Sequence, residues 1–68
     1  MKLKNNIKKY RFENGELTQL ALAEKLDVSR QTIIAIEQGK FNPSVKLALK
    51  MSHLFHCKVE DLFYFEED

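Results

Sequence analysis

The sequence predicts a single all-α domain over residues 1–68, and three observations support that fold class. The chain has two Gly and one Pro, so short turns between helices are expected rather than long irregular connections. Hydrophobic residues make up 44% and charged residues 31%, which is ordinary for a globular protein and too apolar for disorder. Residues 29–39 contain, in order, the features of a helix start, a helix body and a helix stop.

The central helix is predicted between Ser29 and Gly39. The Ser29 hydroxyl can accept a hydrogen bond from an unpaired backbone N–H of the first turn, and Gly39 can take the left-handed conformation that ends a helix. Ile33 and Ile36 share one face, which we expect to lie in the core. The first turn carries long or polar donors, namely Arg30, Gln31 and Thr32. This pattern favours a recognition helix whose start points at a hydrogen-bonding surface.

Two helices are predicted before the central one. The first begins with Asn5 or Asn6 as its N-cap and ends at the turn signal Asn14–Gly15. The second is expected over residues 18–26, and its cap and inward stripe are Thr18, Leu22, Ala23 and Leu26. Asp27 then tolerates the left-handed geometry of a tight turn. Because only a short turn separates the second helix from the central one, the spacing matches a helix-turn-helix.

Further helical segments follow the central helix. Ser44 is expected to cap a helix with a broad apolar face, made by Val45, Leu47, Ala48, Met51, Leu54 and Phe55. One or two more helical turns are predicted over residues 59–63, and the side chains expected to face inward are Val59, Leu62 and Phe63. The β-prone aromatics at 63–65 are candidates for a strand that pairs with residues 2–4, for which a frayed end is the alternative. Other core candidates are Phe41 and Phe65.

Charge is divided unevenly along the chain. Residues 1–50 hold ten Lys or Arg and five Asp or Glu, whereas residues 51–68 hold one and five. The body is therefore basic and the end acidic, although the net charge is only +1. A basic body can meet nucleic-acid phosphates, and the alternative is an ordinary mixed, solvated surface.

Several classes of function are disfavoured. The lone Cys57 allows no intrachain disulfide and fits a reducing cytoplasm. No apolar run approaches the roughly 20 residues of a membrane span, and no apolar block marks a signal peptide. No catalytic constellation or phosphate loop occurs, so we expect neither an enzyme nor a cofactor. No metal site is expected, because a fourth ligand and zinc-finger spacing are missing around His53, His56 and Cys57.

Several motifs together resemble the Cro/CI-type (XRE) helix-turn-helix family, over roughly residues 6–63. The matching segments are Leu17-Thr18-Gln19, Leu22-Ala23-Glu24-Lys25-Leu26, Val28-Ser29-Arg30-Gln31-Thr32-Ile33, Ile36-Glu37-Gln38-Gly39, Asn42-Pro43-Ser44 and Leu47-Ala48. The resemblance implies a five-helix, lambda-repressor-like domain with a small antiparallel sheet from the two chain ends. It also implies a homodimer, with an interface that includes Val59 and Leu62.

The resemblance also assigns roles to individual residues. Gln19 matches a glutamine that braces both a DNA phosphate and the recognition helix, and Arg11 matches an arginine that pairs with Glu37. Positions that reach base edges and flanking phosphates in the major groove correspond to Arg30, Gln31 and Thr32. Ala35 corresponds to a further groove-facing position, and Ser29 is also expected to bind DNA. The family also contacts phosphates at the end of the recognition helix and in the loop after it, and those positions correspond to Gln38, Lys40 and Asn42. Two features depart from the family pattern: the turn at residues 14–17 is one residue longer, and apolar side chains replace polar ones at Leu20 and Ile34, which we expect to be partly exposed.

The function expected from this resemblance is a sequence-specific DNA-binding transcriptional regulator. It would repress from an inverted-repeat operator, which it would bind as a homodimer on double-stranded DNA. An antitoxin, or another protein-interaction module with the same fold, is the alternative.

Overall fold

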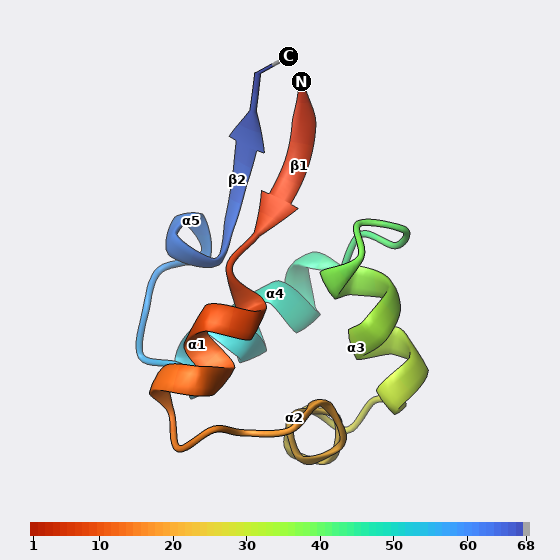
Figure 1. The fold of residues 1–68 in the computed structure, drawn as a ribbon, viewed down its shortest axis with the longest axis vertical. Helices are drawn as coiled ribbons and strands as arrows, with labels where there is room; N and C mark the ends of the chain where they lie inside the picture. The colour runs from red at the N-terminus through yellow and green to blue at the C-terminus, as the bar shows by residue number, and fades with distance from the viewer. Residues whose placement is uncertain (68) are drawn as a thin grey trace.

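The computed structural model describes residues 1–67, and it consists of five helices and two strands (Figure 1). In chain order these are β1 (Lys2–Asn5), α1 (Ile7–Glu13), α2 (Gln19–Leu26), α3 (Arg30–Glu37), α4 (Val45–Leu54), α5 (Val59–Leu62) and β2 (Phe63–Glu66). The mostly helical architecture and the small sheet confirm the predicted fold class. None of the helices in this part of the chain is long and apolar enough to cross a membrane.

Helix starts lie where side-chain oxygens can cap them. The hydroxyl of Thr18 accepts a hydrogen bond from the backbone N–H of Ala21 at 3.0 Å, which satisfies one unpaired donor at the start of α2. The predicted caps of α3 and α4 form in the same way: Ser29 accepts from the N–H of Thr32 at 3.1 Å, and Ser44 from that of Leu47 at 3.1 Å. All three predicted caps are therefore confirmed.

A left-handed residue follows each of the two helices of the helix-turn-helix. Asp27 ends α2 with φ 58°, and Gly39 follows α3 with φ 76°. Asp accepts this conformation better than most residues, and Gly takes it without a Cβ penalty. Both predicted stops are confirmed.

One hydrophobic core holds the helices together. Its largest fully buried side chains come from α1 to α5: Ile7, Leu22, Ile33, Ile36, Met51 and Leu62. The inward stripe of α2 and the isoleucine pair of α3 meet in this cluster, as the sequence predicted. Burying a side chain of this size stabilises the fold by about 1.5–3 kcal/mol. The core therefore fixes how α2 and α3 pack, and it leaves the opposite face of α3 to solvent.

Three apolar predictions were wrong for the part of the chain that the structure describes. Val45 is 76% exposed, because it precedes the buried Leu47 by two residues, or about 200° around a helix. Phe41 and Phe65 are 52% and 65% exposed, since one lies in the loop after α3 and the other on the protruding β2. Neither joins the core.

Leu62 requires a correction of a different kind. Its side chain has no exposed surface and belongs to the core cluster of its own chain. It therefore presents no surface to a second copy, whereas Val59, three residues earlier on α5, is half-buried.

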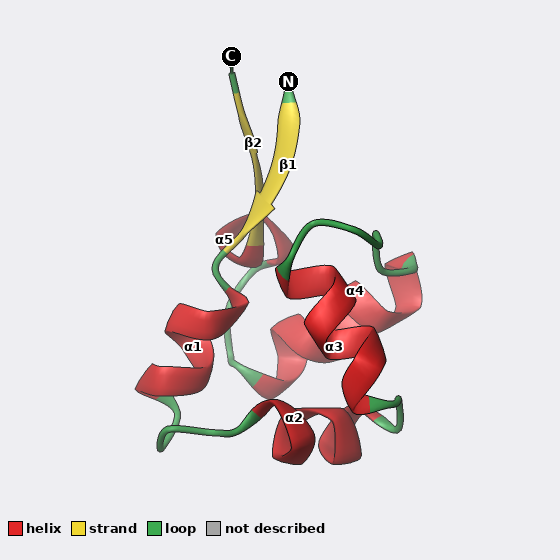
Figure 2. Cartoon of the chain, turned by 45° about the vertical axis from the view of Figure 1, so that its right-hand side comes forward, coloured by secondary structure: helices red, strands yellow, loops and turns green. Residues whose placement is uncertain are grey.

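The two strands form an antiparallel ribbon, which confirms the predicted sheet. Lys2 pairs with Glu66, Leu3 with Phe65, Lys4 with Tyr64 and Asn5 with Phe63. Figures 1 and 2 show the ribbon projecting from the helical body, with both chain ends at its tip. Its base, at Asn5, lies where the strand meets the helices.

Candidate nucleic-acid interface

The outer face of α3 is polar and accessible. Gln31, Ala35 and Gln38 follow one another at helical spacing, on the side away from the buried Ile33 and Ile36. The two glutamines are exposed and Ala35 is half-buried. This face can therefore present two carboxamides and a methyl group to a docking surface.

The Arg30 side chain, from the start of α3, shares a hollow with residues at the start of α2. Arg30 and Gln19 line the same hollow of about 580 Å³, together with Arg11, Thr18 and Leu20. Arg30 is exposed and Leu20 is 55% exposed, as expected for this position. The structure thus places two of the predicted DNA-binding residues, Gln19 and Arg30, beside one hollow.

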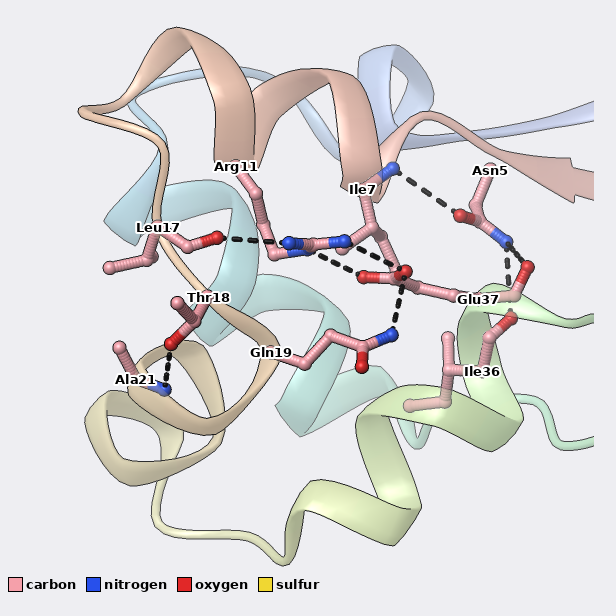
Figure 3. Close-up of polar contacts among 9 residues, drawn as sticks. All are labelled: Asn5, Ile7, Arg11, Leu17, Thr18, Gln19, Ala21, Ile36 and Glu37. Atoms are coloured by element: carbon pink, nitrogen blue, oxygen red, sulfur yellow. Dashed lines mark hydrogen bonds and ion pairs between the residues drawn. The ribbon is translucent and has the colours of Figure 1, made fainter.

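The carboxylate of Glu37 joins three helices (Figure 3). Arg11 donates from Nε to Glu37 Oε2 at 2.8 Å and from Nη2 to Oε1 at 3.1 Å, while Gln19 Nε2 donates to Oε1 at 3.2 Å. The third donor of Arg11, Nη1, reaches the carbonyl oxygen of Leu17 at 2.9 Å. Both charged side chains are almost buried, at 13% and 10% exposure. The network therefore fixes α3 against α1 and α2.

The longer turn before α2 does not disturb this network. Gly15 and Glu16 both take positive φ, at 82° and 55°, and so absorb the extra residue in a compact loop. The backbone then returns to Arg11 through the hydrogen bond from Leu17 N to Arg11 O at 2.9 Å. The expected Arg11–Glu37 pair is confirmed.

The C-terminal end of α3 and the loop after it are also accessible. Gln38, Lys40 and Asn42 are all exposed. Gln38 and Asn42 line a hollow of about 650 Å³ between this loop and the ribbon, and Lys40 is not among the lining residues. Two of the three predicted phosphate-contacting residues therefore share one hollow, and all three are exposed.

Comparison with known proteins agrees with this geometry. A family model described as "Helix-turn-helix" matches residues 7–62, which is most of the chain. The chain belongs to the XRE-type helix-turn-helix family. A relative from Methanocaldococcus jannaschii is 56% identical over 66 residues, covering 97% of this chain and 98% of the relative. Relatives from Bacillus subtilis (44% identical, 97% of this chain and 98% of the relative) and Archaeoglobus fulgidus (41%, 97% and 93%) are similar over the same span. All three are named uncharacterized HTH-type transcriptional regulators, a class that is not enzymatic.

Asn5 contacts α3, and its position in the sequence did not predict that contact. The sequence predicts Asn5 or Asn6 as the N-cap of α1; Asn6 occupies that position, and its side chain makes no capping bond. The Asn5 side chain instead contacts both α1 and the end of α3. Its position just before a helix indicated local hydrogen bonding, but no sequence signal indicated a contact 31 residues away.

Proposed function

We propose that this XRE-type protein is a sequence-specific DNA-binding transcriptional regulator, and that it represses by occupying an inverted-repeat operator as a homodimer in the cytoplasm. The observation that carries the proposal is the exposed polar face of α3, held at a fixed angle by the Glu37 network. The names of its relatives support a regulatory role. Repression needs no further activity, because a bound dimer excludes other proteins from the same DNA.

Base readout is assigned to the start of α3. The major groove admits a helix, and there a guanidinium can take guanine O6 and N7 while a carboxamide takes adenine N6 and N7. Arg30 and Gln31 have these groups and are exposed. Ala35 can offer only a methyl contact to thymine. Each good bidentate pair discriminates against a wrong base by about 1–3 kcal/mol.

Phosphate contacts are assigned to both ends of the helix-turn-helix. Gln19 at the start of α2, with Ser29 and Thr32 at the start of α3, lies where the positive helix ends favour anions. At the other end of α3 the exposed polar side chains are Gln38, Lys40 and Asn42. Such contacts set affinity and register rather than sequence choice.

A dimer would read two half-sites about 34–36 Å apart. The small core of a 68-residue chain makes association favourable, because such chains bury a limited share of their surface on folding. Of the two residues expected at the interface, we propose Val59 on α5, since the single chain leaves part of its side chain accessible to a second copy. Leu62 is not part of this proposal, because it is already in the core.

The proposal is tested by selecting DNA from a random pool with the purified protein and sequencing what is retained. We expect an enriched inverted repeat, and gel-shift titrations should show a strong preference for it over unrelated duplex. The double substitution Arg30→Ala with Gln31→Ala should remove most of that preference, whereas Lys8→Ala on the exposed side of α1 should not. No enrichment, or enrichment that the double substitution leaves unchanged, would overturn the assigned readout.

The alternative is a protein-interaction module such as an antitoxin. It is favoured by Leu20, an apolar side chain that is 55% exposed at the start of α2, where polar residues are usual in the family. A stoichiometric complex with one partner, combined with DNA binding that shows no sequence preference, would favour this alternative. Many antitoxins also bind DNA, so an enriched operator alone would not distinguish the two.

A further inference from the structure

The side chain of Asn5 links the start of α1 to the end of α3 (Figure 3). Its Nδ2 donates to the carbonyl oxygen of Ile36 at 3.1 Å and to that of Glu37 at 3.4 Å. Its Oδ1 accepts from the backbone N–H of Ile7 at 3.3 Å. One carboxamide therefore contacts two helices through opposite ends, and it uses its donor on the recognition helix.

The carbonyls that Asn5 reaches belong to the last turn of α3, where a helix leaves oxygens unpaired. Backbone N–H groups after the helix reach three oxygens of this turn: Gln38 N reaches Ile34 O at 3.0 Å, Gly39 N reaches Ile36 O at 3.0 Å, and Lys40 N reaches Ala35 O at 2.9 Å. The Ile36 oxygen therefore accepts from both Gly39 N and the Asn5 side chain. The carbonyl of Glu37 receives its hydrogen bond from Asn5. Glu37 is thus held twice, at its carboxylate by α1 and α2 and at its backbone by β1.

Asn5 also lies at a joint between the ribbon and the helices. It is the last residue of β1 and pairs with Phe63 of β2. The next residue, Asn6, donates from its backbone N to Leu62 O at 2.8 Å and from Nδ2 to Asp61 O at 3.0 Å, both on α5. Two adjacent asparagines therefore connect α3 to α5, although these helices are far apart in the sequence.

We infer that Asn5 is a positioning residue for DNA recognition, which sets the angle of α3 relative to α5 and the ribbon through its carboxamide donor. This inference rests on the proposed function, because it concerns the same recognition helix. In a dimer that associates near Val59, the angle between α5 and α3 determines how the two recognition helices are spaced. A small rotation of α3 then misplaces both helices with respect to their half-sites.

The decisive variant is Asn5→Asp, which keeps the size of the side chain. It retains the oxygen that accepts from Ile7 N, and its negative charge is favourable at the start of α1. It lacks the donor, and it places a charge against the carbonyl oxygens at the negative end of α3. The variant therefore loses the contact with α3 while the effects on α1 partly offset the loss of overall stability.

The matched control is Asn6→Asp, the same substitution one residue later, which removes only the side-chain contact with α5. Carbonyl ¹³C chemical shifts of the free, isotopically labelled proteins report the contact directly. Asn5→Asp should move the Ile36 and Glu37 resonances, and Asn6→Asp should leave them in place. Unmoved resonances in Asn5→Asp would overturn the inference before any DNA is added.

Affinity for the selected operator and for unrelated duplex is then measured at a temperature where both variants are fully folded. Asn5→Asp should weaken operator binding about tenfold, the effect of one hydrogen bond, and leave affinity for unrelated duplex within about twofold. Partial unfolding would weaken both by the same factor, so an equal loss on both duplexes contradicts a positioning role, as does unchanged operator affinity. If the wild-type protein itself shows no operator preference, the proposed function fails instead.

Discussion

Arg11 Nε lies 2.8 Å from Glu37 Oε2, and this contact joins the first helix to the end of the recognition helix. The pair is bidentate, because Nη2 of the same guanidinium donates to Oε1 at 3.1 Å. Its two side chains are largely shielded from water, at 13% and 10% exposure. Loss of hydration costs each charge free energy, and the partner charge with its hydrogen bonds offsets that cost, so removing one partner leaves the other uncompensated.

Breaking this pair should therefore destabilise the whole domain. Arg11→Ala leaves the Glu37 carboxylate nearly buried with Gln19 as its remaining side-chain donor. The free energy of unfolding should fall by about 3–5 kcal/mol, measured by urea denaturation. Lys8→Ala, on the exposed side of the same helix, should change it by less than about 0.5 kcal/mol. A loss below about 1 kcal/mol for Arg11→Ala would show that the pair behaves like a solvated surface contact.

A phosphate contact should reveal itself in the salt dependence of DNA binding. Lys40 is exposed in the loop that follows α3, next to the proposed DNA surface. Lys40→Ala should weaken binding to all sequences about equally and reduce the slope of log affinity against log salt by about 0.9 per protomer. Lys8→Ala removes the same charge from α1 and should leave the slope unchanged. A change of sequence preference in Lys40→Ala would instead place this lysine in base readout.

Local signals predicted most of the fold. The caps Thr18, Ser29 and Ser44 depend on residues within one turn, and the structure has them at the predicted positions. The same holds for the left-handed Asp27 and Gly39. These features are predictable because their energetics involve a few neighbouring backbone groups. The resemblance to a family added the Arg11–Glu37 pair, which spans 26 residues and has no local signal of its own.

The errors arose where burial depends on how elements pack. Val45 is an apolar side chain like the buried Leu47 on the same helix, but the orientation of α4 leaves it exposed. Leu62 and Val59 differ little in the sequence, yet one is fully buried and the other is not. The contact of Asn5 with α3 exists only after the ribbon and the helices have packed together. Sequence pattern gives the face of an element, and tertiary packing decides what covers that face.

The difference between Val59 and Leu62 gives a test of the proposed dimer. Val59→Asp places a charge on a half-buried position of α5 and should shift sedimentation towards a monomer, with a parallel loss of operator binding. Leu62→Ala instead opens a cavity in the core and should lower the free energy of unfolding by about 2–5 kcal/mol. A dimer that survives Val59→Asp, with the fold intact, would place the interface elsewhere on the surface.

Alkaline pH should weaken the fold through Cys57. Burial, with a smaller contribution from the Asp61 carboxylate, raises the pKa of the Cys57 thiol, while a hydrogen bond with Tyr10 opposes the rise. Since the folded-state pKa is the higher one, the unfolded chain releases this proton first. The stabilisation is therefore complete below the unfolded-state pKa of about 8.5 and is lost as pH rises through the folded-state value.

Urea denaturation between pH 7 and pH 10 should show this loss as a falling midpoint. Desolvation also raises the pKa of the Tyr10 hydroxyl, so part of the decline belongs to that residue and persists without the thiol. Cys57→Ala should make the decline with pH shallower, because the alanine has no proton to release. Equal declines in the two proteins would mean that the thiol titrates alike in the folded and unfolded chains, and that its surroundings do not favour the neutral form.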